Sequence, residues 1–197
     1  MAIEIGMVLQ SASDIAEEAR LLESWGCDYA CAGEHVSFNV PVGNSFISLS
    51  VAAGATTKIR LMSTIVLTPL YPAALLAKLG ATLHVASGGR YNLGIGVGGE
   101  MPTEFQACGV PVHERGARTN ESLEIIRLLW STNGARFDGR FNSFERVTIA
   151  PRHDPPPAIW VSGRSDAAMR RAARFGDAWA PDQRQAAMRP PGMSGST

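Results

Sequence analysis

The sequence predicts an α/β fold in which strands and helices alternate along a single domain. Short apolar runs of strand character alternate with amphipathic helical segments at intervals of about thirty residues. Polar and ionisable residues collect where these apolar runs end, whereas the starts of the runs are less polar. The chain has 197 residues, 45% of them hydrophobic and 18% charged, which is enough for one domain with a substantial core.

Three strand–helix units are predicted in the first half of the chain. The strands are expected at Ile3–Leu9, Asp28–His35 and Ile59–Thr68. The first helix is indicated by apolar residues that recur on one helical face, namely Ile15, Ala19, Leu22 and Trp25. A second helix is expected roughly over Phe46–Gly54. Pro72 opens a third, because proline suits the first turn of a helix.

A fourth strand, over residues 90–98, leads into the sequence GIGVGG at residues 94–99. Gly94, Gly96 and Gly99 match G-x-G-x-x-G, a dinucleotide-binding pattern that requires a helix directly after it. Here the pattern follows three earlier units, and the next residues, EMPTEFQACGVP, predict an irregular loop. A Rossmann fold is therefore disfavoured, and the glycines are expected to let the backbone pass close to another group.

The remaining elements continue the alternation. A helix is expected from near Arg115, followed by a hairpin that turns at Asp138-Gly139. Two further strands, Ala158–Gly163 and Asp177–Pro181, flank a helix that begins at Ser165 or Asp166. The domain is predicted over residues 1–182, and residues 183–197 lack apolar periodicity and are expected to form an irregular tail.

Composition argues against several partners. Eighteen basic residues balance eighteen acidic ones, so a nucleic-acid partner is not expected. No apolar run approaches the ~20 residues that span a bilayer, and the first residues lack a signal peptide's basic start. The three cysteines have no metal-ligand spacing and are expected to be small buried thiols in a reducing cytoplasm.

Repeated βα units close as an open doubly wound sheet or as a (β/α)8 barrel. The polar residues at the strand ends favour the barrel, because barrel enzymes carry their chemistry on that rim. The segments LMSTIVLTPLYP, LAKLGATLHVASGGRYNLGIGVGG, EFQACGVPVHERGARTNESLEIIRLLW and PPAIWVSGRSDAAMRRAARFGDAW resemble, in this order, the bacterial luciferase-like monooxygenase family. The resemblance is greatest to the oxidoreductases that use a deazaflavin coenzyme.

This resemblance implies an α/β fold of the TIM (β/α)8-barrel type that is incomplete, with about six of eight strands present. It implies coenzyme F420 as cofactor, with FMN as the alternative, and hydride or oxygen transfer that involves a small organic substrate. Homodimerisation is expected, because such relatives pair through helices beside the early strands and the open sheet edges need cover.

The resemblance also implies the site residues. His35, beside Glu34, is expected to transfer protons at the rim. A bulge with a cis peptide bond at Ile65–Val66, followed by Thr68, is expected to support the cofactor ring. Gly98, Gly99 and Glu100 are expected to approach the cofactor. The loop of Ser162, Gly163, Arg164 and Ser165 is expected to bind its phosphate, because a helix N-terminus and an arginine favour an anion.

Two other functions stay open. A phosphate-binding lyase or isomerase would want a strand-end lysine or paired carboxylates for a metal, and neither Lys58 nor Lys78 ends a strand. A shortened, non-catalytic relative could bind flavin, or nothing, and serve as a structural dimer. A bound yellow chromophore would distinguish an oxidoreductase from both.

Overall fold

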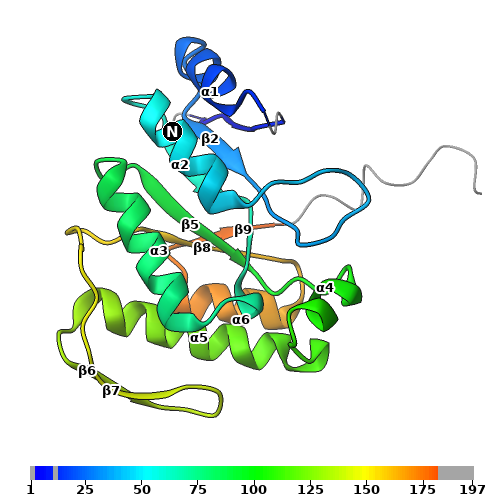
Figure 1. The fold of residues 1–197 in the computed structure, drawn as a ribbon, viewed down its shortest axis with the longest axis vertical. Helices are drawn as coiled ribbons and strands as arrows, with labels where there is room; N and C mark the ends of the chain where they lie inside the picture. The colour runs from blue at the N-terminus through cyan, green and yellow to red at the C-terminus, as the bar shows by residue number, and fades with distance from the viewer. Residues whose placement is uncertain (1–2, 11–12, 182–197) are drawn as a thin grey trace, which may run out of the picture.

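The computed structural model describes residues 3–10 and 13–181 (Figure 1). A parallel sheet runs in the order β1-β2-β3-β5-β8-β9, and β4 extends β3 and pairs with β5. Its strands are β1 (Gly6–Val8), β2 (Tyr29–Ala32), β3 (Arg60–Ser63), β4 (Val66–Leu67), β5 (Tyr91–Gly96), β8 (Ile159–Ser162) and β9 (Ala178–Ala180). All six predicted strands are confirmed, the third of them divided into β3 and β4. The predicted tail at 183–197 lies outside the described residues.

Helices connect the strands and pack against one another in sequence. They are α1 (Ile15–Ser24), α2 (Ser45–Ala55), α3 (Ala73–Ala86), α4 (Pro102–Ala107), α5 (Arg115–Ser131) and α6 (Asp166–Phe175), with short 3-10 helices at Thr68–Leu70 and Val112–Glu114. Helix α1 packs against α2, α3 against α5, and α6 against β8. The predicted hairpin forms as β6 (Ala135–Asp138) and β7 (Ser143–Val147), which project away from the sheet in Figure 1.

The strand order identifies the sheet as part of a barrel. Neighbours in space follow the order of the chain from β1 to β9 without a reversal, and every pair in the sheet is parallel. A doubly wound sheet instead reverses its strand order at a switch point. The six-stranded, half-barrel form of the (β/α)8 fold is therefore confirmed. Within the described residues, β1 and β9 each keep one edge without a partner strand.

The hydrophobic core lies between the outer face of the sheet and the helices. The strands contribute alternate residues to it, including Ala30, Leu61, Leu93, Ile95, Ile159 and Val161. The intervening residues face the inside of the half barrel, because successive side chains of a strand point to opposite faces. Burial raises the pKa of the Cys31 thiol, on that inner face, to about 12.

Three expectations are corrected. Residues 102–107 form α4 rather than a loop, since Pro102 occupies the first helical position, where its missing N–H has no cost. Trp25 is 66% exposed, because it follows the last residue of α1 and leaves that helix's buried face. Cys108 is exposed after the end of α4, whereas Cys31 is buried and Cys27 is half-buried.

A bulge interrupts the central strands between β3 and β4. Met62 pairs with Asn92 and Val66 with Ile95, so one strand advances four residues while the other advances three. The Ser63 hydroxyl fills the gap in pairing: it accepts from Gly94 N at 2.8 Å and donates to Gly94 O at 2.9 Å.

The cis peptide bond of this bulge joins Thr64 to Ile65, so the expected position at Ile65–Val66 is wrong by one residue. The hydrogen bonding explains the position. Thr64 N still donates to Ala32 O, which ends the pairing with β2, and Val66 already pairs with β5. The rearranged step therefore lies between these two residues, and an apolar stretch of sequence carries no signal for it.

The bulge predicts unequal effects of alanine at two glycines. A Cβ atom on Gly94 would lie 1.9 Å from the Ser63 carbonyl oxygen, so Gly94→Ala should destabilise the fold by about 3 kcal/mol or more. Gly54, within α2, has open space around it, so Gly54→Ala should be neutral or stabilise by up to about 1 kcal/mol. Urea unfolding of both variants measures the difference. Equal midpoints would show that the close approach of the two strands does not constrain the fold.

Candidate active site

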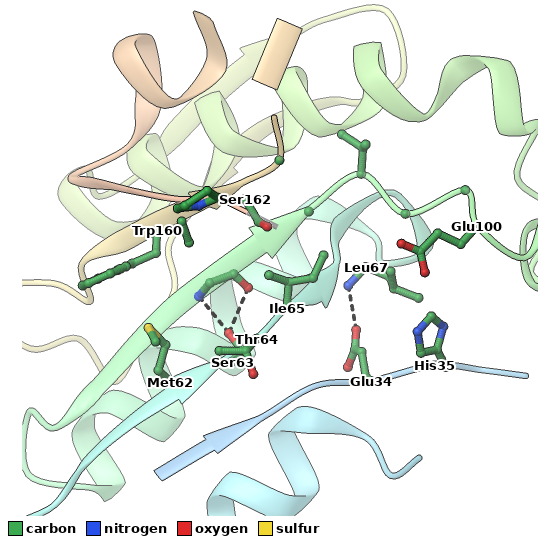
Figure 2. A pocket seen from close by; sticks show the side chains of 18 of the residues that line it. Glu34, His35, Met62, Ser63, Thr64, Ile65, Leu67, Glu100, Trp160 and Ser162 are labelled. Carbon is green, nitrogen blue, oxygen red and sulfur yellow. Dashed lines mark hydrogen bonds between the residues drawn. The ribbon is translucent and has the colours of Figure 1, made fainter. Parts of the chain in front are cut away.

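A cavity of about 790 Å³ opens at the carboxyl ends of the parallel strands (Figure 2). Eight predicted site residues line it: Glu34, His35, Ile65, Gly98, Gly99, Glu100, Ser162 and Gly163. They come from segments spread between residues 34 and 163, so the half barrel brings together the rim that the sequence predicted. The four other predicted residues, Val66, Thr68, Arg164 and Ser165, lie outside the lining.

Val66 and Thr68 are fully buried. Val66 belongs to the hydrophobic core, and Thr68 donates its hydroxyl hydrogen to Val66 O at 3.4 Å. At the bulge, the residues in the cavity wall are Ser63, Thr64 and Ile65 (Figure 2). A Cβ atom on Gly96 would lie 1.8 Å from the Ile65 Cδ1 atom. The glycine therefore leaves room for Ile65, a requirement of protein packing that the glycine pattern did not reveal.

Gly98 and Gly99 carry the backbone away from β5 through positive φ angles of 59° and 108°. Glycine adopts this left-handed region without the steric penalty that a Cβ atom brings. A Cβ atom on Gly99 would also lie 2.8 Å from Arg115 Nε. The two glycines thus let the chain turn from the strand toward α4 and leave Glu100 on the cavity rim.

The carboxylate of Glu34 ties the end of β2 to three other segments. Its Oε1 accepts from Leu67 N at 2.9 Å, as Figure 2 shows. Its Oε2 accepts from Asn44 Nδ2 at 3.0 Å, from Ser45 Oγ at 3.0 Å and from Tyr71 OH at 2.9 Å. Burial and the Glu34 charge raise the pKa of Tyr71, so the phenol keeps its hydrogen and donates it. The Glu34 carboxylate thus holds the end of β2, residues 44–45, β4 and Tyr71 together.

His35 lies beside Glu34 but has a different environment. Its Nδ1 atom lies 3.0 Å from Glu104 Oε1, and its ring stacks on Phe38 with centroids 4.0 Å apart and planes 10° apart. The resemblance to the family picks out Glu104 together with Phe105, with loop packing and contact with a ligand as equal alternatives. It does not pair Glu104 with His35, because the two are separated by 69 residues and local sequence patterns do not reach that far.

The predicted phosphate loop leads into α6. Ser165 is the N-cap, and its hydroxyl accepts from Ala168 N at 3.2 Å. Gly163 N donates to Ala180 O at 3.2 Å, so this N–H group already has an acceptor within the protein. The N–H groups of Asp166 and Ala167 have no acceptor within the helix, because the first turn of any α-helix lacks one. The first N–H groups of α6, rather than that of Gly163, are therefore the ones in this loop without an acceptor inside the helix.

The residues present fit the predicted cofactor. The cavity volume lies within the roughly 300–1,000 Å³ typical of small-molecule sites. Its walls are mainly apolar, through Met62, Ile65, Leu67, Val97 and Trp160. Bare backbone at Gly98-Gly99 and a few polar groups complete it. Apolar walls with a helix N-terminus at one end suit a flat heteroaromatic ring that carries a phosphate.

Two other kinds of site, a metal centre and a membrane-spanning helix, are absent from residues 3–10 and 13–181. Among them, no three histidine, cysteine or acidic side chains gather closely enough to hold a metal ion. The helices of this part of the chain are also too short or too polar to cross a bilayer.

Comparisons with known proteins agree with this geometry. The family model described as luciferase-like monooxygenase matches residues 3–189. The F420-dependent glucose-6-phosphate dehydrogenase of Kineococcus radiotolerans is 31% identical over 167 residues, which cover 83% of this chain and 49% of the dehydrogenase. The chain spans about half the length of the curated relatives it matches.

Two solved structures share the fold. The monooxygenase RslO1 from Streptomyces bottropensis is 30% identical, with a TM-score of 0.78, over 87% of this chain and 57% of that one. The oxygenating constituent of 3,6-diketocamphane monooxygenase from Pseudomonas putida, solved with FMN, is 24% identical, with a TM-score of 0.76. The match covers 90% of this chain and 57% of the camphane enzyme.

The hydrogen bonds of Glu34 predict a large effect on stability. In Glu34→Gln the amide nitrogen cannot accept, so at least one buried donor loses its partner and the free energy of unfolding should fall by about 2 kcal/mol or more. Glu145→Gln provides a control, because Glu145 pairs with Arg136 at the exposed hairpin and surface ion pairs contribute little. Urea unfolding measures both. A Glu34→Gln midpoint equal to that of the control would refute the organising role.

Proposed function

The chain belongs to the luciferase-like monooxygenase family, and from that premise we propose that it is an oxidoreductase that binds a flavin or deazaflavin in its strand-end cavity. The substrate is a small organic molecule. The observation that carries this proposal is the cavity itself. Its walls are apolar, His35 lies in its lining, and the N-terminus of α6 begins just beyond Ser162 and Gly163. The chain spans about half the length of its curated relatives. That it has an oxidoreductase activity like theirs is therefore proposed as well.

Each part of the cavity has a separate task in this proposal. The bound coenzyme would supply hydride transfer or, as a flavin, oxygen chemistry. Ile65 and its apolar neighbours exclude water and support the ring. The imidazole of His35 holds or takes up a proton at the cavity wall, because an imidazole ring nitrogen can either donate or accept a proton. Arg164 and the first turn of α6 hold the phosphate of the coenzyme.

Coenzyme F420 is the proposed cofactor and FMN the alternative. A relative named as F420-dependent at 31% identity supports the first, and the neighbour solved with FMN shares the fold. Purified protein should take up one of the two when each is titrated separately. Quenching of Trp160, which lies in the cavity lining, would report binding. Failure to bind either would favour the structural relative without a cofactor.

We also propose that the chain forms a homodimer. Ile47 and Val51 lie one turn apart on the outer side of α2 and are 66% and 42% exposed. An exposed apolar stripe on a helix beside the early strands suits a partner surface. Light scattering of Ile47→Glu beside the wild type tests this, and a wild-type monomer at all concentrations would refute it.

The phosphate assignment predicts weaker coenzyme binding in Arg164→Ala. Loss of one charge-assisted contact, worth about 1.5–3 kcal/mol, should raise the coenzyme dissociation constant roughly ten- to hundredfold. Stability should hardly change, since Arg164 is exposed on the rim. Arg170→Ala removes the same charge from an exposed position further along α6 and is the matched control. Equal affinities of the Arg164→Ala variant and the wild type would remove Arg164 from the site.

The proton-transfer assignment predicts the opposite pattern for His35→Ala. Coenzyme affinity should be retained, while single-turnover reduction of the bound coenzyme by a substrate of the wild type should slow by about 10²–10⁴-fold. His113→Ala is the control, because His113 is exposed in the short 3-10 helix Val112–Glu114 and does not line the cavity. An unchanged rate in His35→Ala would show that His35 takes no part in proton transfer.

A further inference from the structure

Glu104 presents a carboxylate to one nitrogen of the His35 ring. The Nδ1 atom lies 3.0 Å from Glu104 Oε1 and 3.2 Å from Oε2. An ionised carboxylate can only accept hydrogen bonds, so a close Nδ1 must carry the hydrogen. In a neutral imidazole the hydrogen sits on one nitrogen alone, and the other, Nε2, then keeps its lone pair.

The position of Glu104 is itself tightly held. The side chain is 1% exposed and starts from α4. Its Oε2 accepts from Val36 N at 2.6 Å and from Ser37 N at 3.2 Å, which are the residues immediately after His35. These two donors direct Oε2 to the backbone and leave Oε1 to the imidazole. The carboxylate thus fixes both the loop and the ring that the loop carries.

Phe38 fixes the remaining freedom of the ring. It stacks on the imidazole almost in parallel, so rotation of the ring out of its plane would break that contact. His35 lines the cavity, whereas Glu104 does not. The nitrogen that stays available to a molecule in the cavity is therefore Nε2.

We infer that Glu104 is a positioning residue that holds His35 as the Nδ1–H tautomer and so presents Nε2 to the cavity as the proton acceptor. Its catalytic consequence rests on the proposed function. When Nε2 takes a proton from the substrate, the ring becomes an imidazolium that still carries the Nδ1 hydrogen. The Glu104 carboxylate then lies against that positive charge, which favours the transfer.

Glu104→Gln tests the inference because it should reverse the tautomer. The two backbone donors require an acceptor, so the amide oxygen should face Val36 and Ser37, and the amide NH₂ should face His35. Nδ1 then accepts a hydrogen bond, and the hydrogen of the neutral ring moves to Nε2. Nitrogen-15 NMR of the imidazoles, recorded with rising pH until the His35 signals no longer change, distinguishes the two neutral tautomers. The His35→Ala spectrum assigns the signal.

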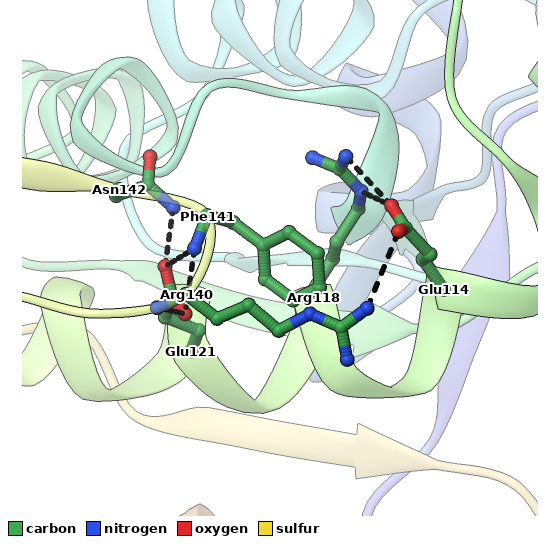
Figure 3. Close-up of polar contacts among 6 residues, drawn as sticks. All are labelled: Glu114, Arg118, Glu121, Arg140, Phe141 and Asn142. Carbon is green, nitrogen blue, oxygen red and sulfur yellow. Dashed lines mark hydrogen bonds and ion pairs between the residues drawn. The ribbon is translucent and has the colours of Figure 1, made fainter.

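Glu121→Gln is the matched control (Figure 3). Glu121 is also a buried glutamate that fixes a loop: its carboxylate accepts from Arg140 N at 2.8 Å, from Phe141 N at 3.0 Å and from Asn142 Nδ2 at 2.9 Å. The same chemical change there should cost stability but leave the His35 signal unaltered. Glu104→Asp keeps a carboxylate and should retain the Nδ1–H tautomer, which separates loss of the acceptor from misfolding.

The inference expects Nδ1–H in the wild type and Nε2–H in Glu104→Gln. It also expects unchanged coenzyme affinity and a fall in the single-turnover rate of about 100-fold or more in that variant. An Nε2–H wild type, or an Nδ1–H tautomer retained in Glu104→Gln, would overturn it. A reversed tautomer with an undiminished rate would overturn its catalytic consequence. The tautomers are measured without coenzyme, so a wild type that has the Nδ1–H tautomer but binds neither coenzyme would refute the proposed function alone.

Discussion

The hydroxyl of Ser63 joins the two central strands of the half barrel at the point where their backbones cannot pair. It bonds both the N–H and the carbonyl of Gly94, and Tyr91 OH lies 3.1 Å from it in the same buried space. Burial raises the pKa of Tyr91, so this network stays protonated and neutral. Because the extra residue is accommodated here, β4 resumes its pairing with β5 and Ile65 enters the cavity wall. Gly94 and Gly96 of β5 are thus required by the packing of the bulge, because a Cβ atom at either position would clash with it.

Four glutamates, one half-buried and three buried, have the same structural role: each fixes a neighbouring segment by accepting its backbone N–H groups. Glu23 accepts from Thr57, Lys58 and Ile59 at 2.9, 2.6 and 2.9 Å, where the chain enters β3. Burial alone would raise the pKa of Glu23, but these three donors hold it below its usual value. Glu34, Glu104 and Glu121 act on other loops in the same way. A carboxylate suits this task because it accepts several hydrogen bonds and donates none.

Different segments of the half barrel place different chemical groups on the two sides of the cavity. On one side, the end of β2 carries His35, with its ring held by Glu104 and Phe38. On another side, β8 ends at Ser162 and leads to the N-terminus of α6. The inner face between them carries Met62 and Trp160, and Trp160 meets Tyr29 edge-on at 6.2 Å. An imidazole on one side and a helix N-terminus on another are the features on which the proposed binding of a phosphorylated, redox-active coenzyme rests.

The sequence by itself determined most of the elements and their order, with α4 the helix that it missed. Apolar periodicity and helix-terminal residues such as Pro72 and Ser165 act within a few residues, so the six strands, the hairpin and the polar rim could be predicted. Only the tertiary structure decided how distant residues meet. The offset between Met62–Val66 and Asn92–Ile95 placed the cis bond at Thr64–Ile65, and the half barrel brought Glu104 to His35 across 69 residues. Such contacts depend on strand register and on where a loop returns to the sheet, and local periodicity carries neither.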